Sequence, residues 1–359
     1  MRSLEETYSG KKVFVTGHTG FKGTWLIQIL SILGANIKGY ALVPETELNL
    51  FHELSGFEIC ESEINDLRNK EALLKSVKDF QPDFVFHLAA QPLVRRSYEI
   101  PSDTFEINAI GTAILLDAVR QLNQKCAVIL ITTDKVYHNN EWEYPYREGD
   151  RLGGYDPYSA SKACAELVVD SYRNSFFNPL KIEVHGKALA VGRAGNVIGG
   201  GDWSKDRLIP DIVKSLHQNN TISIRNPNAV RPWQHVIEPL FGYLELGKKL
   251  SEAPLRYSKE YNFGPNISDT LSVKNMVEKS IDFWGSGNFI IEQNSNNPHE
   301  AGLLKLDISR VLSELNWKPV FNSQIAIERT IAWYKGYYEG ISAKNLVEND
   351  IEFYLSLNK

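Results

Sequence analysis

One stretch near the N-terminus limits the possible folds of this chain more than any other. Residues 17–23 read GHTGFKG; they follow the short apolar run 12–16 and lead into the apolar run 23–33, which ends before Gly34. Glycines at this spacing permit a tight turn and let backbone N–H groups approach an anion, which the field at a helix N-terminus also stabilises. A strand, this loop and a helix in that order predict the first unit of a dinucleotide-binding fold, with a purely structural turn as the alternative.

Further strands and helices alternate along the first half of the chain. We expect strands at 12–16, 36–42, 63–65, 84–89 and 128–132, and helices at 23–33, 67–80, 100–122 and 158–173. Such alternation is typical of a parallel sheet covered on both faces. The predicted class is α/β, a Rossmann-type doubly wound parallel sheet with a smaller, interleaved C-terminal α/β lobe. We expect the first domain to span 1–195, with segments near 233–265 returning to it, and the second to contain most of 196–359.

Composition excludes several partners. The chain has 359 residues, a formal net charge of −5 and 43% hydrophobic residues, which is ordinary for a globular protein. No basic stripe suggests nucleic acid, and no apolar run reaches the ~18 residues of a membrane span. Cys60, Cys126 and Cys164 are isolated and lack metal-ligand spacing, so we expect no metal site and a reducing, cytoplasmic setting.

The choice of dinucleotide depends on the end of the second strand. The acidic residue that usually binds the ribose 2′-hydroxyl is missing there, and no arginine is present to bind a 2′-phosphate, so NAD is favoured over NADP. Asp66 is predicted either to reach the adenine or to cap the helix 67–80. His18 lies inside the glycine loop, where it is predicted to be a pyrophosphate neighbour or a packing residue.

A second motif, Tyr158 and Lys162, has a spacing that places both side chains on one helix face. An ammonium beside a phenol favours the phenolate, so Lys162 is expected to lower the pKa of Tyr158 and make it a base. The alternative is an ordinary surface pair.

Together these motifs resemble the extended short-chain dehydrogenase/reductase family of nucleotide-sugar enzymes. The resemblance rests on the runs GHTGFKGTWL, HLAAQPLVRRSY, TTDKVY, GGYDPYSASKACAEL, RAGNVIGGGDWSKDRLIPD, RPWQHVIEPL and PHEAGLLKLD. Within the family these runs are most similar to the 4,6-dehydratases that act on CDP-glucose. The resemblance implies that NAD is bound by Gly17, His18, Gly20, Phe21, Lys22, Gly23, Asp66, Leu67, Leu88, Ala89, Ala90, Asn108, Thr132, Tyr158 and Lys162. It also implies a homodimer packed through the helices 100–122 and 158–173, or a tetramer.

The resemblance also implies a chemical role for each catalytic residue. Tyr158, aided by Thr133, would take the proton of the sugar C4 hydroxyl. Lys135 would then remove the C5 proton, and Asp134 would protonate the departing C6 hydroxyl. A lysine base must be neutral, which burial and the charge of Lys162 would favour. Adjacent residues of a strand face opposite sides, so Asp134 and Lys135 can share a pocket only if the strand has already ended.

The predicted nucleotide-sugar ligands follow the ends of the strands or lie after residue 195. They are Gln91, Arg95, Asn196, Arg207, Leu208, Arg231 and His299. Asn196 and Arg231 would bind phosphate oxygens by charge-assisted hydrogen bonds, and Arg207 with Leu208 would enclose the nucleotide. Two alternatives remain open, a nucleotide-sugar 4-epimerase on the same scaffold and a non-catalytic NAD-sensing protein.

Overall fold

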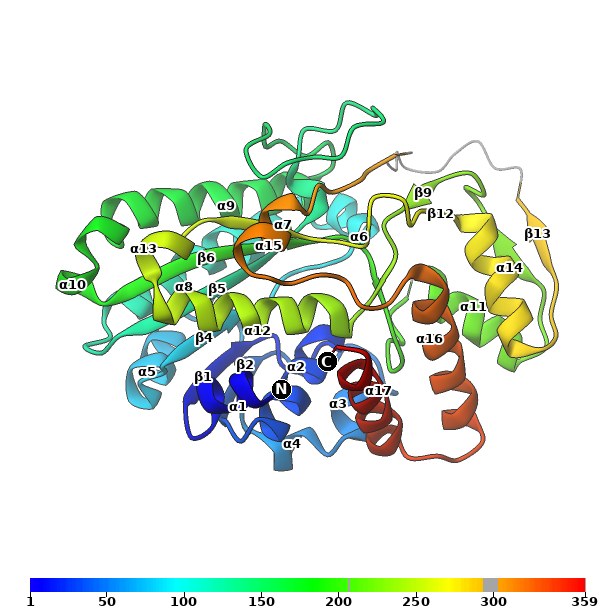
Figure 1. The fold of residues 1–359 in the computed structure, drawn as a ribbon, viewed down its shortest axis with the longest axis horizontal. Coiled ribbons are helices and arrows are strands. Elements are labelled where there is room, and N and C mark those ends of the chain that lie inside the picture. Colours follow the sequence, from blue (N-terminus) through cyan, green and yellow to red (C-terminus); the bar gives the residue numbers. More distant parts are fainter. Residues whose placement is uncertain (206, 293–302, 359) are drawn as a thin grey trace.

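The computed structural model describes residues 1–205, 207–292 and 303–358. Its centre is a sheet of seven parallel strands in the order β3-β2-β1-β4-β5-β6-β11 (Figure 1). The strands are β1 (Lys12–Thr16), β2 (Asn36–Ala41), β3 (Glu61–Ile64), β4 (Phe84–His87), β5 (Cys126–Thr133), β6 (Lys187–Ala194) and β11 (Glu260–Phe263). The first six strands have the Rossmann order, in which the chain reverses direction across the sheet between β1 and β4. The predicted doubly wound α/β class is confirmed.

Both faces of the sheet are buried because neighbouring residues of each strand belong to different cores. In β1, Val13 and Val15 pack into one core and Phe14 into the other. The first core contains α2 (Phe21–Ile32) and α12 (Ile237–Glu252), while the second contains α5 (Lys70–Phe80), α8 (Gly111–Arg120) and α9 (Pro157–Ser175). Figure 1 shows α9 and α12 on opposite sides of the strands. This two-sided burial explains why the strands read as continuous apolar runs.

Several predicted elements have different ends in the structure. The helix expected at 67–80 begins at Lys70, because the side chain of Asn69 accepts from the backbone N–H of Ala72 and caps it. The helix expected at 100–122 is α7 (Pro101–Phe105), a π-helical turn (Glu106–Ile110) and α8 in succession. A short N-terminal helix, α1 (Arg2–Tyr8), was not expected from the sequence; the hydroxyl of Tyr8 donates to the carbonyl of Leu244 at 2.7 Å and attaches α1 to α12.

The region after residue 195 surrounds the carboxyl ends of the strands. Its elements include three two-stranded sheets, which pair β7 with β10, β9 with β12 and β8 with β13. The elements of this region are β7 (Val197–Ile198), α11 (Leu208–His217), β8 (Ile222–Ile224), β9 (Val230–Arg231), β10 (Gln234–His235), β12 (Leu271–Ser272), α14 (Val273–Trp284), β13 (Phe289–Ile291), α15 (Ser309–Glu314), α16 (Ser323–Tyr338) and α17 (Ala343–Leu357). The short helix α13 (Pro254–Tyr257) instead packs against α12 and β6, near α10 (Figure 1). The chain leaves this region to form α12 and β11, which pack on and extend the main sheet.

Short helical segments complete the connections between the strands. They are α3 (Leu50–Glu53), α4 (Gly56–Ile59), α6 (Val94–Glu99), α10 (Ile182–His185) and two 3₁₀ turns, Asp134–Val136 and Pro179–Lys181. Among the helices in the described ranges, none has the length and apolar character to cross a bilayer.

Candidate active site

A large cavity of about 1810 Å³ opens where the strands of the main sheet end. Its wall includes the glycine loop, the segments that follow β4 and β5, the start of α9, and the region from 194 to 231. Ligands of open α/β sheets bind in this position, outside the carboxyl ends of the strands. The cavity therefore joins the predicted cofactor loop to the predicted substrate residues.

The glycine loop is a tight cradle in which side chains do not fit. A Cβ atom on Gly17, whose φ is +76°, would lie 2.7 Å from the backbone nitrogen of Ala89. A Cβ atom on Gly23 would lie 2.0 Å from the carbonyl oxygen of Gly17. Gly20 is the N-cap of α2 and provides no side-chain cap, so the first N–H groups of that helix stay available to an anion. These residues fit a dinucleotide pyrophosphate. Further predicted cofactor residues that line the same cavity are Phe21, Lys22, Asp66, Leu67, Leu88, Ala89, Ala90 and Thr132.

His18 and Asn108 are predicted cofactor residues that do not line the cavity, and for His18 the structure favours the packing alternative. His18 is fully buried behind the loop, where Nε2 hydrogen-bonds Ser62 Oγ at 2.7 Å and the ring packs edge-on against Phe51. Burial lowers the pKa of His18 to about 4, so the ring is a neutral packing residue. The amide of Asn108 donates to the carbonyl of Gln91 and to Ser161 Oγ, which fixes the loop after β4 to α9.

Asp66 lines the cavity but does not cap the following helix. Its carboxylate accepts from the backbone N–H of Arg68 at 2.8 Å, and from the guanidinium of the same residue, at 2.8 Å from Nη2 and at 3.1 and 3.2 Å from Nε. The hydrogen bonds from Arg68 lower the pKa of Asp66. The capping prediction for Asp66 is wrong, because Asn69 has that role, and the adenine contact stays a prediction.

Tyr158 and Lys162 lie on the first turns of α9 and line the cavity. Asp156 caps this helix by accepting from the backbone N–H of Ser159 at 2.9 Å, which fixes where Tyr158 projects. Burial raises the pKa of Tyr158 to about 12, although the hydrogen bond with Thr133 and the charge of Arg207 lower it. Burial also lowers the pKa of Lys162 to about 8, while the charge of Glu166 raises it. The predicted lowering of the Tyr158 pKa by Lys162 is wrong for this structure: burial is the larger effect, and it also weakens the lysine cation.

Strand β5 ends at Thr133, and residues 134–136 form a 3₁₀ turn. The strand has therefore ended before Asp134 and Lys135, which is the condition under which both side chains could face one pocket. The side chain of Lys135 lines the cavity and is 25% exposed; Nζ donates to Asn196 Oδ1 at 3.3 Å and lies 3.8 Å from Asp134 Oδ1. Asp134 is 1% exposed and lies beneath the cavity wall, where Thr133 Oγ1 donates to its Oδ1 at 2.9 Å. Of these two side chains, only that of Lys135 reaches the cavity. The carboxylate of Asp134 is directed inward, where it accepts the hydrogen bond from Thr133.

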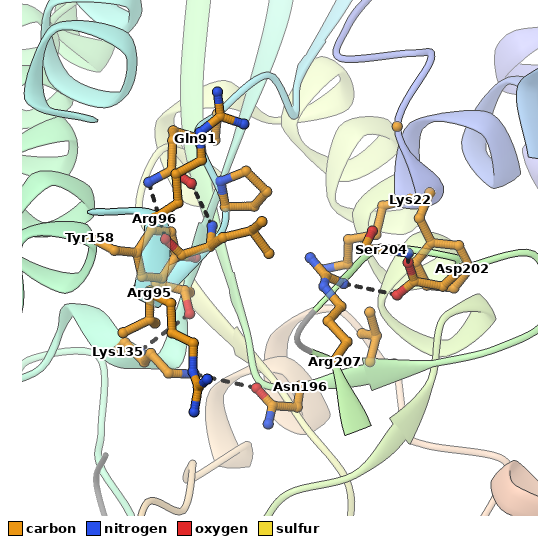
Figure 2. A pocket seen from close by; sticks show the side chains of 18 of the residues that line it. Lys22, Gln91, Arg95, Arg96, Lys135, Tyr158, Asn196, Asp202, Ser204 and Arg207 are labelled. Carbon is orange, nitrogen blue, oxygen red and sulfur yellow. Dashed lines mark hydrogen bonds and ion pairs between the residues drawn. The ribbon is translucent and has the colours of Figure 1, made fainter. Parts of the chain in front are cut away.

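Six of the seven predicted substrate residues line the cavity, namely Gln91, Arg95, Asn196, Arg207, Leu208 and Arg231. His299 lies outside the described residues. The amide nitrogen of Gln91 already donates to the carbonyl of Leu93 and to Thr104 Oγ1, so its side chain shapes the loop and has little capacity left for a sugar. Arg231 donates to the carbonyl of Val230 at 3.1 Å. Figure 2 shows Lys135 and Tyr158 on one side of the cavity and Lys22 and Arg207 on the other.

A buried ionic network behind Tyr158 and Lys162 was not predicted from the sequence. The guanidinium of Arg193, 2% exposed, donates to both oxygens of Glu166 and to the hydroxyl of Tyr137. Thr132 Oγ1 donates to the same carboxylate at 2.5 Å. Glu166 lies one turn after Lys162 on α9, and this spacing was the signal in the sequence. The network connects β5, β6 and α9 directly beneath the site.

Two further ion pairs at the cavity were also missed. Arg96 of α6 donates to Glu45 Oε1 at 2.7 Å, and Arg207 donates to Asp202 Oδ2 at 3.1 Å. Arg96 was visible in the sequence beside Arg95. Glu45 and Arg96 are 51 residues apart and meet only through the tertiary fold. Asp202 and Arg207 are five residues apart in one loop, but no regular spacing indicated that they pair.

The parallel sheet, the glycine cradle and the buried Tyr158–Lys162 pair define a Rossmann-type protein of the extended short-chain dehydrogenase/reductase class. Residues 14–330 match the GDP-mannose 4,6 dehydratase family, and the chain belongs to that family. It is 47% identical to the CDP-glucose 4,6-dehydratase of Salmonella typhimurium, with 97% of each chain covered. It is 25% identical to the dTDP-glucose 4,6-dehydratase of Shigella flexneri, with 94% of this chain and 95% of that one covered.

Solved structures share the fold. The epimerase Mth375 from Methanothermobacter thermautotrophicus has a TM-score of 0.80 at 21% identity, covering 94% of this chain and 96% of that one. DesIV, a dTDP-glucose 4,6-dehydratase from Streptomyces venezuelae solved with NAD and TYD bound, has a TM-score of 0.72 at 21% identity, covering 90% of this chain and 97% of that one.

Proposed function

We propose that this chain is an NAD-dependent hydro-lyase that converts CDP-glucose to CDP-4-keto-6-deoxyglucose. The observation that carries the proposal is the placement of Lys135. Its side-chain nitrogen lies in the cavity wall directly after β5, in the same cavity as Tyr158, and an epimerase needs no second base there. The 47% identity to a CDP-glucose 4,6-dehydratase supports the choice of sugar nucleotide.

The first step in this proposal is oxidation at C4. NAD, held by the glycine cradle, supplies the chemistry of accepting the C4 hydride and returning a hydride to C6. The phenolate oxygen of Tyr158 takes the proton of the C4 hydroxyl, so that the C4–O bond becomes a carbonyl. Thr133 hydrogen-bonds Tyr158 and Arg207 adds positive charge nearby, and both favour the phenolate against the effect of burial.

The second step is removal of water. The C4 ketone acidifies the C5 proton, which passes to the neutral amine of Lys135, and the electron pair of the C5–H bond forms the C5–C6 double bond as the C6–O bond breaks. We assign Asp134 as the group that supplies a proton to the departing hydroxyl, a role that requires its carboxyl to turn from beneath the wall toward the cavity. Lys135 then returns a proton to C5 as C6 is reduced.

Three further residues of the cavity wall, Asn196, Arg207 and Arg231, are assigned to the nucleotide diphosphate. Asn196 already contacts Lys135 Nζ, so a phosphate or sugar oxygen that approaches the lysine also meets this amide. Arg207 and Arg231 line the cavity, and we assign them to the diphosphate because one guanidinium group can donate two parallel hydrogen bonds to phosphate oxygens.

We further infer a homodimer built on α8 and α9. Three large apolar side chains on these helices are exposed in the single chain. They are Ile110, directly before α8, at 54%, Leu167 of α9 at 58%, and Phe176, the C-cap of α9, at 44%. Burying such side chains against a second copy is favourable. Sedimentation of the purified protein tests this assembly, and a Leu167→Glu variant is expected to shift it toward the monomer.

A panel of nucleotide glucoses tests the proposed reaction. The protein is incubated with NAD⁺ and CDP-, dTDP-, UDP- or GDP-glucose, and the products are weighed by mass spectrometry. We expect loss of one water from CDP-glucose without net NADH. A product of unchanged mass would indicate an epimerase, and absence of turnover with every nucleotide would contradict an enzymatic function.

A further inference from the structure

Arg207 is held at the cavity by a carboxylate that comes from the preceding loop. It precedes α11, and its side chain is 31% exposed. Nη1 donates to Asp202 Oδ2 at 3.1 Å, and the same guanidinium is close enough to Tyr158 and Lys22 to lower the pKa of both. Its charge therefore faces the interior of the site (Figure 2).

Asp202 is itself fixed in place. It is 4% exposed, and its second oxygen, Oδ1, accepts from the backbone N–H of Ser204 at 3.1 Å. The hydroxyl of Tyr334, on α16, accepts from the backbone N–H of Asp202 at 2.9 Å and donates to its carbonyl at 2.5 Å. One buried hydroxyl thus satisfies both polar groups of the Asp202 main chain.

The loop around Asp202 is clamped against α16 by tight packing. A Cβ atom on Gly200 would lie 1.9 Å from the ring of Trp333, and Trp25 Nε1 donates to the Gly200 carbonyl at 3.0 Å. The ring of Trp203 packs against those of Trp333 and Tyr334, at centroid distances of 5.9 and 6.0 Å. The position of Asp202 is therefore set by α16 as well as by its own loop.

We propose that Asp202 is a positioning residue for substrate binding, which aims Arg207 at the diphosphate of the nucleotide sugar, and that α16 belongs to the substrate site through Tyr334. This inference rests on the proposed function for the identity of the ligand. Asp202 engages only part of a guanidinium that has five donors, so the rest remain for phosphate oxygens. An arginine on a flexible stem loses rotamer freedom on binding, and a fixed carboxylate reduces that loss in advance.

The test measures CDP and cytidine binding by calorimetry in matched variants. Asp202→Asn keeps the side-chain shape and removes the charge; we expect CDP affinity to fall roughly tenfold and cytidine affinity to stay unchanged, because only CDP carries phosphate. In steady-state assays KM for CDP-glucose should rise by a similar factor while kcat changes less than about twofold. Tyr334→Phe should give a smaller loss of the same kind, and Tyr337→Phe, on the same helix, should give none.

A double-mutant cycle separates positioning from a general structural effect. Asp202→Asn is expected to have no further effect on CDP affinity in an Arg207→Ala background. An equal loss in both backgrounds, an equal loss for cytidine, or a fall in kcat with unchanged CDP affinity would each overturn the proposal. If the wild-type protein binds CDP but does not turn over CDP-glucose, the proposed function fails while the binding cycle still decides the role of Asp202. If it binds no CDP, both fail.

Discussion

Glu166→Gln is expected both to destabilise the fold and to change the pH dependence of turnover, because the same carboxylate pairs with buried Arg193 and raises the pKa of Lys162. Glu166 is 2% exposed and accepts from Arg193 Nε at 2.9 Å on each oxygen, and from Thr132. Glutamine keeps the volume but leaves the guanidinium of Arg193 buried without its counter-charge. Breaking a buried pair in this way costs about 3–5 kcal/mol.

The melting temperature provides the first assay of this change. At roughly 2 cal/mol/K per residue, the unfolding entropy of 359 residues is about 0.75 kcal/mol/K, so Tm should fall by about 4–7 °C. Asp79→Asn is the matched control, since it breaks the exposed pair between Lys75 and Asp79 and should leave Tm nearly unchanged. A fall of less than about 1 °C for Glu166→Gln would refute the view that this network stabilises the sheet.

The pH dependence of turnover provides the second assay. The charge of Glu166 raises the pKa of Lys162 against the effect of burial, which brings it to about 8. Removing that charge should let Lys162 lose its proton at lower pH, so the alkaline limb of the rate profile should move to lower pH. A limb that stays in place would show that Lys162 does not titrate in this range.

Three further changes test other parts of the account. Lys135→Met should block water loss while C4 oxidation continues, seen as accumulating NADH absorbance with CDP-glucose; water loss that persists would exclude Lys135 as the base. Gly23→Ala should abolish NAD binding in calorimetry, because its Cβ would lie 2.0 Å from the Gly17 carbonyl, while Gly149→Ala, with open space around it, should bind normally. Burial raises the pKa of Glu238 to about 8, so the stability that this group contributes is present in full below its unfolded pKa of ~4.3 and is lost as pH rises toward 8. Glu238→Gln should remove that loss, which is on the order of 5 kcal/mol across the interval, and an identical Tm–pH curve would contradict this.

Much of the fold follows from local patterns in the sequence. The strand β1 has the predicted bounds, and β2, β4 and β5 differ by one to three residues at their ends, because both faces of each strand are apolar and the run itself marks the strand. The start of α5 was predicted too early. Asp66 and Asn69 are both good caps; in the structure the carboxylate of Asp66 is taken up by the backbone and side chain of Arg68, two residues later, and Asn69 caps the helix.

The site was predictable where a residue type and its spacing determine the geometry, as for the glycines and for Tyr158 with Lys162. Burial, by contrast, depends on segments distant in sequence. His18 packs behind its loop because Gly39 of β2 has no side chain; a Cβ there would lie 2.3 Å from the imidazole ring. For the same reason the sequence predicted a lowered pKa for Tyr158, whereas desolvation raises it in the structure.

In the proposed reaction the hydride removed from C4 returns to C6 of the same sugar after water is lost. CDP-glucose carrying deuterium at C4 tests this directly when the product is examined by mass spectrometry and NMR. The account predicts a 4-keto-6-deoxy product that keeps the deuterium in its C6 methyl group. Deuterium returned to C4, or released into a free reduced cofactor, would contradict it.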